Sequence, residues 1–263
     1  MKKLSNIIIF LAKTIKQSDS YGFIQPLLVI LQLILNKQTI KYKYKKHSLY
    51  INNDSINSVT YHIINSTPKI EKMVSKIDSC KTAVDIGANN GIFSYFLKKK
   101  FPDAVVYVFE PSDILQKIIS QNLESYEKII LEKKAVSDID GEISFFINPL
   151  SEQTNSLNKE SVIKGNIKSL NKEIIEVKVP SCTLNSYFFN IDSIDVLKVD
   201  IQGAEYLMLK GANTIMPKTK MAFFEVSFLD EKVFNATDEL RKYYTNFEVV
   251  NDVKMGADIM FYN

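Results

Sequence analysis

A carboxylate and two glycines lie close together in the segment Asp85-Ile-Gly87-Ala-Asn89-Asn-Gly91. A short apolar run typical of a buried strand precedes this segment, and a helical pattern follows it. Glycines at such a strand-to-helix turn let the backbone approach a ligand closely, beside the amide groups of the helix N-terminus. An acid two positions before the first glycine would repel a pyrophosphate, whereas it suits the ammonium and sulfonium charges of S-adenosylmethionine.

A second acid, Glu110, follows the next apolar strand, nineteen residues after Gly91. A carboxylate at this place can accept hydrogen bonds from both hydroxyl groups of a ribose. The two features together indicate a site for S-adenosylmethionine, while each alone is a weak signal. The glycine spacing differs from G-x-G-x-x-G, which disfavours a nicotinamide-dependent oxidoreductase. The alternative is a glycine turn and an exposed acid that bind no ligand.

Two later strands of the predicted sheet each end in an acid, Asp200 and Glu225. Ligands of parallel α/β sheets bind outside the carboxyl ends of the strands, so both side chains should face one crevice. A hydroxyl group is a poor nucleophile, and a general base can speed its methylation. Asp200 is the first candidate for this base or for orienting the acceptor, and Glu225 is the second. In the alternative, both carboxylates only support the loops, with Asp200 held by Lys198 or by helix amides.

No histidine or cysteine cluster in the sequence has the spacing of metal ligands, and we expect no metal site of that kind. A magnesium site made only of oxygen atoms from Asp200 and Glu225 would leave little trace in a sequence. His62 precedes the sheet in a segment that could cover the crevice and contact substrate. A lone histidine is more often an ordinary core or surface residue.

Strands and helices must alternate to bring these groups together, and the pattern from residue 82 onward does so. Strands are predicted at residues 82–86, 104–109, 129–136, 194–200 and 221–225, with helices at 92–100, from 112 or 113 to 123, at 206–210 and at 238–244. This alternation predicts an α/β fold with a mainly parallel sheet covered by helices on both faces. Residues 247–251 and 258–262 are predicted as a closing antiparallel pair at the sheet edge.

The region before this sheet, residues 1–80, is predicted as a helical and β-hairpin extension, and residues 81–263 as the main domain. Residues 39–51 alternate in character with a period of two and are followed by turn residues, which indicates a strand or hairpin. Lysines interleaved with Tyr42 and Tyr44 could hold RNA by charge and stacking. The plainer interpretation is an edge strand whose lysines face water.

The first 35 residues contain two apolar runs, at residues 4–12 and 26–35. Both runs are shorter than the about 20 residues of a membrane-spanning helix, and no signal-peptide cleavage site follows the first. We expect both runs to form helices that pack on the domain. The alternative is a weak peripheral membrane contact through residues 1–35, because Ile7, Ile8, Leu11 and Ile15 can share one helical face beside lysines.

Composition narrows the class of protein further. Of 263 residues, 46% are hydrophobic, and 33 basic against 30 acidic residues give a formal net charge of +3. This is a globular composition, and it gives no reason to expect a nucleic-acid partner. Two cysteines cannot build a disulfide framework, so a reducing, cytoplasmic location fits best. The oligomeric state cannot be read from these patterns.

Over residues 40–262 the chain resembles the FkbM-type methyltransferase family, a branch of the class I S-adenosylmethionine-dependent enzymes with a Rossmann-like sheet. The matching stretches are Val84-Asp-Ile-Gly-Ala-Asn-Asn-Gly-Ile-Phe-Ser94, Val108-Phe-Glu-Pro111, Lys134-Ala-Val-Ser-Asp138 with Gly141, Leu197-Lys-Val-Asp-Ile-Gln-Gly-Ala-Glu205, Gly211-Ala212 and Phe224-Glu225. The family usually has an acid at the position of Gln202. This departure puts in doubt any catalytic or metal-binding role that depends on that acid.

The resemblance implies roles for individual residues. Asp85, Gly87, Asn89 and Gly91 would hold the methionine part of the cofactor, Glu110 the ribose, and Ser137 and Asp138 would lie by the adenine ring. Asp138 could bind the exocyclic amine or could equally begin the turn towards Gly141. The polar segment at residues 149–173 is expected to recognise the acceptor, with Asn155 and Ser156 as candidates for bonding a sugar hydroxyl.

The resemblance also implies the reaction. We expect an S-adenosylmethionine-dependent O-methyltransferase acting on a hydroxyl of a small molecule or glycan, as in glycan or secondary-metabolite biosynthesis. One alternative is a catalytically silent scaffold that binds the cofactor or docks on a membrane. A nucleic-acid methyltransferase is disfavoured, because Asp200-Ile-Gln-Gly stands where adenine-N6 enzymes have a Pro-Pro block.

Overall fold

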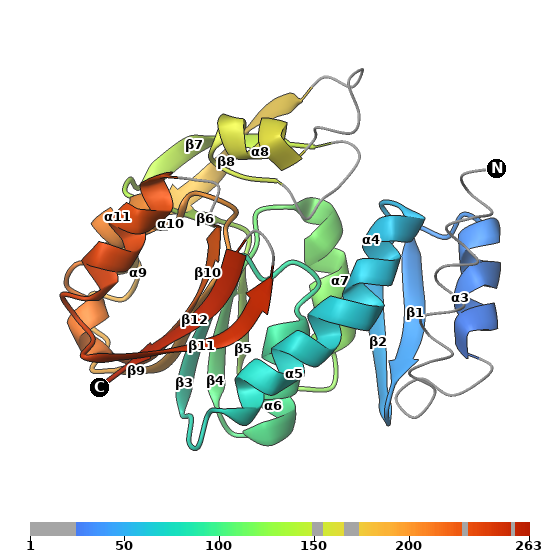
Figure 1. Ribbon diagram of the computed structural model, residues 1–263, viewed down its shortest axis with the longest axis horizontal. Helices are drawn as coiled ribbons and strands as arrows, with labels where there is room; N and C mark the ends of the chain where they lie inside the picture. The colour runs from blue at the N-terminus through green and yellow to red at the C-terminus, as the bar shows by residue number, and fades with distance from the viewer. Residues whose placement is uncertain (1–24, 149–154, 166–173, 228–230, 254–255) are drawn as a thin grey trace.

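The central feature of the molecule is a seven-stranded sheet (Figure 1). The computed structural model describes residues 25–148, 155–165, 174–227, 231–253 and 256–263. The strand order is β11-β12-β10-β9-β3-β4-β5. The bounds are β3 (Thr82–Ile86), β4 (Val105–Phe109), β5 (Ile129–Glu132), β9 (Ile194–Val199), β10 (Thr219–Ser227), β11 (Asn246–Val253) and β12 (Gly256–Tyr262). The neighbours from β5 to β10 pair in parallel, while β12 pairs antiparallel with both β10 and β11. The predicted mainly parallel α/β sheet with an antiparallel edge is confirmed.

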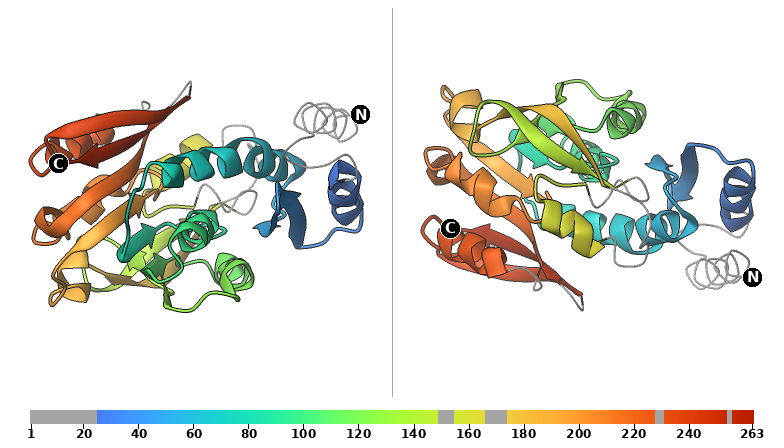
Figure 2. Two further views of the ribbon diagram at one scale, coloured as in Figure 1. Left: turned by 90° about the horizontal axis from the view of Figure 1, so that it is seen from below. Right: turned by 90° about the horizontal axis from the view of Figure 1, so that it is seen from above.

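Helices cover both faces of the sheet, as the two further views show (Figure 2). The helices of the sheet region are α6 (Ile92–Lys100), α7 (Asp113–Leu123), α9 (Leu184–Tyr187), α10 (Glu205–Lys210) and α11 (Glu231–Leu240). Side chains of successive strand residues enter different hydrophobic clusters: Ala83 packs with α6 and α7, while Val84 packs with α9 and α10. Strands that are apolar on both faces form the interior layer of such a fold.

Two of the predicted elements need correction. The strand predicted over residues 129–136 is divided, because β5 ends at Glu132 and β6 (Ala135–Val136) joins a separate sheet with β7 (Gly141–Ile147) and β8 (Ile175–Cys182). Lys133 and Lys134 separate the two strands, and such charged side chains do not continue a buried strand. The helix predicted at residues 238–244 begins and ends earlier, as α11.

A hairpin of β1 (Thr39–Tyr44) and β2 (His47–Asn52) precedes the sheet, as predicted. Lys41 and Lys43 are exposed, whereas the rings of Tyr42 and Tyr44 are buried. The Tyr42 hydroxyl shares a 2.6 Å hydrogen bond with the Thr67 hydroxyl. Rings held inside the core cannot stack on RNA bases, so the hairpin matches the plainer interpretation of lysines that face water.

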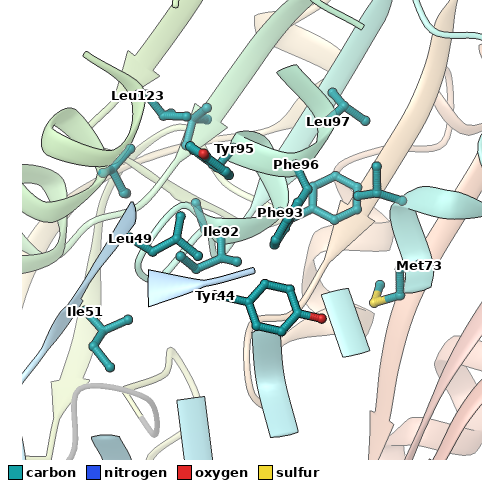
Figure 3. Close-up of a cluster of buried hydrophobic side chains, with 14 of the residues drawn as sticks. Tyr44, Leu49, Ile51, Met73, Ile92, Phe93, Tyr95, Phe96, Leu97 and Leu123 are labelled. Atoms are coloured by element: carbon teal, nitrogen blue, oxygen red, sulfur yellow. The ribbon is translucent and has the colours of Figure 1, made fainter. Parts of the chain in front are cut away.

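The extension also contains α3 (Gln25–Ile34), α4 (Ile56–Tyr61), the π-helical turn η1 (His62–Ser66) and α5 (Thr67–Ser75). Figure 3 shows side chains of the hairpin, such as Leu49 and Tyr44, packed together with Phe93 and Phe96 of α6 and Met73 of α5. The boundary predicted at residue 80 therefore marks a change in the sequence pattern, and one hydrophobic core contains residues from both sides of it. The predicted face of Ile7, Ile8, Leu11 and Ile15 lies outside the described residues.

A substitution in the hairpin tests this shared core. Leu49 is fully buried between the hairpin and α6, so Leu49→Ala should lower the free energy of unfolding by about 2–5 kcal/mol through lost burial and the cavity left behind. Urea unfolding followed by circular dichroism and by tyrosine fluorescence should still give one coincident transition. Val249→Ala, at an exposed position, is the matched control. Two separate transitions would contradict a continuous core.

Candidate active site

A cavity with a volume of about 240 Å³ opens at the carboxyl ends of β3, β4, β9 and β10. Residues from the turn after β3, the ends of β4, β9 and β10, and the run α4–η1–α5 line it. In Figure 1 this helical run crosses in front of the sheet. The cavity therefore lies where parallel α/β sheets bind their ligands, with the extension forming one of its walls.

The glycine turn forms the floor of the cavity beside β3. Gly87 has a φ of 69°, and a Cβ atom there would lie 2.0 Å from the backbone oxygen of Asp200. Only glycine fits this crossing of two backbones. Asn89, with a φ of 54°, and Gly91, with a φ of 73° at the start of α6, complete the turn. Gly87 and Asn89 line the cavity, while Gly91 lets α6 pack closely against Ile119.

Glu110 follows β4 and lines the same cavity, directly beside the glycine turn. Its side chain is buried, and both carboxylate oxygens accept backbone hydrogen bonds of 3.0 Å, from Asn89 and from Ser112. These bonds fix the carboxylate at the end of the strand. A carboxylate accepts hydrogen bonds only, which is the chemistry that a diol ligand requires.

Asp85 lies behind the cavity rather than in its wall. The side chain has no exposed surface, and one oxygen accepts a 2.7 Å hydrogen bond from the Ser94 hydroxyl. The other oxygen lies 3.2 Å from the Lys198 ammonium, which also donates to the Gly87 carbonyl at 2.6 Å. The predicted direct contact between Asp85 and a ligand is therefore replaced by an indirect one, in which an ion pair fixes the glycine turn. Lys198 is paired as predicted, although its nearer partner is Asp85 and not Asp200 at 4.0 Å.

Asp200 and Glu225 come together at the far side of the cavity, joined by the side chain of Gln202. The Gln202 amide donates to Asp200 at 2.6 Å and to Glu225 at 2.8 Å. Asp200 and Glu225 also share a hydrogen bond with each other. Two neighbouring carboxyl groups repel each other when both are ionised, which favours the retention of a proton on one of them.

The surrounding charges decide which carboxyl group holds that proton. The negative charge of Asp200, and then burial, raise the pKa of Glu225 to about 8, against the opposite effect of Lys69. Burial disfavours the ionised form of Asp200, but Lys198 and the hydrogen bond from Glu225 outweigh it and hold the pKa of Asp200 below its usual value. The proton therefore resides on Glu225, and Asp200 carries the charge.

Lys69 connects the extension to this carboxyl pair. Its ammonium lies 3.3 Å from Glu225 and 2.9 Å from Asp258, a buried acid of β12. Burial alone would lower the pKa of Lys69, but Glu225 and Asp258 outweigh burial and raise it. Nothing in the sequence signals this contact, because 156 residues separate Lys69 from Glu225.

His62 lines the cavity from the first turn of η1, in agreement with the interpretation that its segment covers the crevice. The side chain is buried, and its Nε2 atom lies 3.2 Å from the Asn90 amide. Burial lowers the pKa of His62 to about 4, so the ring is neutral at neutral pH. Its neighbour Tyr61 also lines the cavity. π-helical turns of this kind occur frequently at functional sites.

Asn155 and Ser156 both lie in the cavity wall, as predicted for the segment at residues 149–173. The Ser156 hydroxyl donates to the carbonyl of Gln202 at 2.9 Å, and the Asn155 side chain accepts from the backbone of Asn148 at 2.8 Å. Both side chains therefore hold the loop against the turn after β9. The rest of that predicted segment, residues 149–154 and 166–173, lies outside the described residues.

Ser137 and Asp138 are not among the cavity-lining residues, which corrects their predicted place beside an adenine ring. The strand predicted over residues 129–136 is divided, and its second part turns away with β6. Ser137 is fully buried and its hydroxyl shares a 2.7 Å hydrogen bond with that of Ser181. At this end of the cavity the lining residues are instead Pro111, Leu115, Lys134, Ala135 and Val136.

Glu205 supports the turn that carries Asp200. One of its oxygens accepts hydrogen bonds of 3.2 Å from the backbones of Ile201 and Gly203. Burial raises the pKa of Glu205 to about 7, partly offset by these backbone bonds. In the described part of the chain, no three His, Cys, Asp or Glu side chains are arranged to hold a metal ion.

The strand order and the site together define the class. Five parallel strands with a glycine turn after the first, an acid after the second, and an antiparallel β12 inserted between β10 and β11 form the fold of class I methyltransferases. The match to the Methyltransferase FkbM domain covers residues 85–248, and the chain belongs to this family. The predicted family is thereby confirmed.

The individual proteins to which the chain is similar are distant in sequence. The chain is 27% identical to methyltransferase sdnD of Sordaria araneosa over 53% of its length and 63% of the relative's. It is 24% identical to 2-O-methyltransferase NoeI of Sinorhizobium fredii, over 66% of this chain and 75% of the relative. Among solved structures, precorrin-6y C5,15-methyltransferase of Geobacter metallireducens overlays with a TM-score of 0.45 at 10% identity, covering 76% of this chain and 88% of that one. The chain thus spans less than two thirds of the length of sdnD.

The raised pKa of Glu225 predicts a pH-dependent stability. Folding raises this pKa from 4.5 to about 8, so the contribution to stability is complete below pH 4.5 and is lost as the pH rises through about 8. Between pH 6.5 and 8, the unfolding free energy of the wild-type protein should fall by up to about 1.4 kcal/mol per pH unit because of Glu225. The variant Glu225→Gln should not show this fall. Urea unfolding at a series of pH values measures this dependence of the unfolding free energy on pH. Glu142→Gln, at an exposed position, should keep the wild-type slope; an unchanged slope in Glu225→Gln would refute the shared proton.

Proposed function

We propose that this chain is an S-adenosylmethionine-dependent O-methyltransferase that acts on a hydroxyl group of a small molecule or glycan. The observation that supports it most directly is the shape of one cavity, which has the glycine turn and Glu110 on one side and the Asp200–Glu225 pair on the other. The relative NoeI is a 2-O-methyltransferase, which agrees with an oxygen acceptor.

The residues around the glycine turn fit the cofactor. A Cβ atom at Gly87 would collide with the backbone after β9, so the turn presents bare backbone to the cavity. Glu110 is held at the end of β4 by backbone amides, at a place where a carboxylate can accept hydrogen bonds from a ribose diol. Asn89 and Gly87 would border the methionine part of the cofactor. Leu115 and Val136 offer apolar walls for its adenine ring. When bound, S-adenosylmethionine supplies an electrophilic methyl group.

The Asp200–Glu225 pair has the properties of a general base for a hydroxyl acceptor. Below pH 8 the pair already holds one proton on Glu225, and the lowered pKa of Asp200 gives it little affinity for a second. Above pH 8 both groups are ionised, and the pair can take up the acceptor proton with a pKa of about 8. A base of that pKa is far better matched to a hydroxyl than an ordinary carboxylate. Lys69 and Lys198 lie beside the pair and partly offset its negative charge in this state.

The acceptor would lie between this pair and the wall formed by the extension. His62 is neutral and Tyr61 carries a phenol, so both offer hydrogen bonds without a charge. Asn155 and Ser156 hold the opposite loop in place, and we propose that they shape the acceptor pocket more than they bond the acceptor. Neutral polar side chains such as these suit the hydroxyl groups of a sugar or related metabolite.

Cofactor binding can be tested before the acceptor is known. Calorimetric titration with S-adenosylmethionine should give saturable binding that Glu110→Ala weakens about 10–100-fold, because hydrogen bonds to a charged group contribute about 1.5–3 kcal/mol. Glu142→Ala is the control for loss of a carboxylate at an exposed site. Nicotinamide dinucleotide should not bind. A folded protein that fails to bind S-adenosylmethionine would exclude the proposed enzyme.

Transfer itself is tested with a labelled methyl donor and a panel of glycan and metabolite acceptors. The kcat/KM should rise with pH to a plateau above about 8, and Glu225→Gln should abolish the rise. Asp200→Asn should lower kcat by about 10²–10⁴-fold while cofactor affinity stays unchanged. A wild-type rate that does not vary between pH 6.5 and 8 would contradict the shared base. Cofactor binding without transfer to any acceptor would favour the silent scaffold.

A further inference from the structure

The short helix α3 exposes an unusually apolar surface. Five large side chains on it and just after it, which we call the α3 face, are between 47% and 64% exposed: Leu27, Leu28, Leu31, Ile34 and Leu35. The backbone of Leu35 still donates to Leu31, so the helical turn continues through this residue. Contiguous exposed apolar side chains of this kind mark interaction surfaces in soluble proteins.

The α3 face lies opposite the side by which the helix packs. At 3.6 residues per turn, the five exposed side chains fall within about 120° of the helix circumference. Pro26, Val29 and Ile30 are buried on the other side, and Val29 and Ile30 join the core that contains the hairpin. A helix that is apolar all round needs a second apolar or interfacial environment besides the core.

Position in the molecule leaves this face accessible to a flat partner. Figures 1 and 2 both show α3 at one end of the structure, beyond the hairpin and opposite the β11–β12 end. Gln32 fixes the helix to the hairpin through hydrogen bonds of 2.8 Å to the backbone of Lys41. The helix is thus held in a defined orientation at the tip of the molecule.

Charge is distributed very unevenly along the chain, although the total is only +3. Residues 1–53 contain nine lysines and one aspartate, a net charge of +8, while residues 54–263 carry 24 basic and 29 acidic residues, a net charge of −5. Residues 25–53 contain no acid at all. Within the described residues, Lys37, Lys41, Lys43 and Lys46 are exposed and form no ion pair, so their charges are free to meet an anionic partner.

We propose that the α3 face and the lysines beside it bind the surface of an anionic lipid bilayer. Leucine and isoleucine side chains beside lysines are the composition of a helix that lies in the membrane interface, where the apolar face enters the acyl boundary and the lysines meet anionic headgroups. No helix of the described residues is long and apolar enough to cross a bilayer, which agrees with lateral contact. RNA is a poorer match, because the tyrosine rings of the hairpin are buried.

Flotation of the full chain with lipid vesicles tests this proposal. The chain should float with vesicles of phosphatidylcholine mixed with phosphatidylglycerol, and much less with phosphatidylcholine alone. The double variant Leu31→Ser with Ile34→Ser should lose flotation, while Ile175→Ser with Phe189→Ser, which are exposed elsewhere, should float as the wild type does. Circular dichroism confirms that each variant is folded, since the substituted side chains are exposed.

A second pair of variants tests the electrostatic part. Lys41→Gln with Lys43→Gln should weaken binding to anionic vesicles by about 25-fold, because each lysine near such a surface contributes about a factor of five. Lys117→Gln with Lys210→Gln makes the same change in net charge at other exposed positions and should not alter binding. The proposal is refuted if the full chain does not float, if the Leu31 and Ile34 variant floats normally, or if sedimentation shows a dimer that this variant dissociates.

Discussion

The geometry of the site depends on balancing charge where the parallel strands end. Four carboxyl groups, Asp85, Asp200, Glu225 and Asp258, meet two ammonium groups, Lys69 and Lys198, at one edge of the sheet. Most of these groups are withdrawn from water, and an unpaired buried charge is costly. Two ammonium groups cannot neutralise four carboxylates. The raised pKa of Glu225 reduces this excess of negative charge, because the group keeps its proton below about pH 8.

Strand pairing determines which partners meet. Asp85 on β3 lies directly beside Lys198 on β9, and Glu225 on β10 lies directly beside Asp258 on β12. Lys69 of α5 forms ion pairs with both members of the second pair, Glu225 and Asp258. Since α5 belongs to the same core as the hairpin, the extension fixes one wall of the cavity and also supplies a charge that the carboxyl pair requires.

The sequence predicted the site residues that directly follow a recognisable strand. The glycine turn, Glu110, Asp200 and Glu225 each stand at the end of an apolar strand, and parallel topology alone brings such positions to one edge. Ser137 and Asp138 were misplaced, because a pair of lysines moves the following strand to another sheet. Asp85 was expected at the ligand, but its spacing does not show that Lys198 lies beside it. The contact between Lys69 and Glu225 depends on tertiary packing, which no local pattern encodes.

Gln202 gains a physical explanation from this charge balance. The family usually has an acid at this position. A fifth carboxyl group here would add negative charge to a site in which carboxyl groups already outnumber ammonium groups. The glutamine amide instead donates one hydrogen to Asp200 and one to Glu225, so it joins the two groups without adding charge. Its φ of 53° lies in the left-handed region, which residues other than glycine adopt uncommonly. Gln202 thus preserves the carboxyl pair, and its presence does not favour a catalytically silent protein over an enzyme.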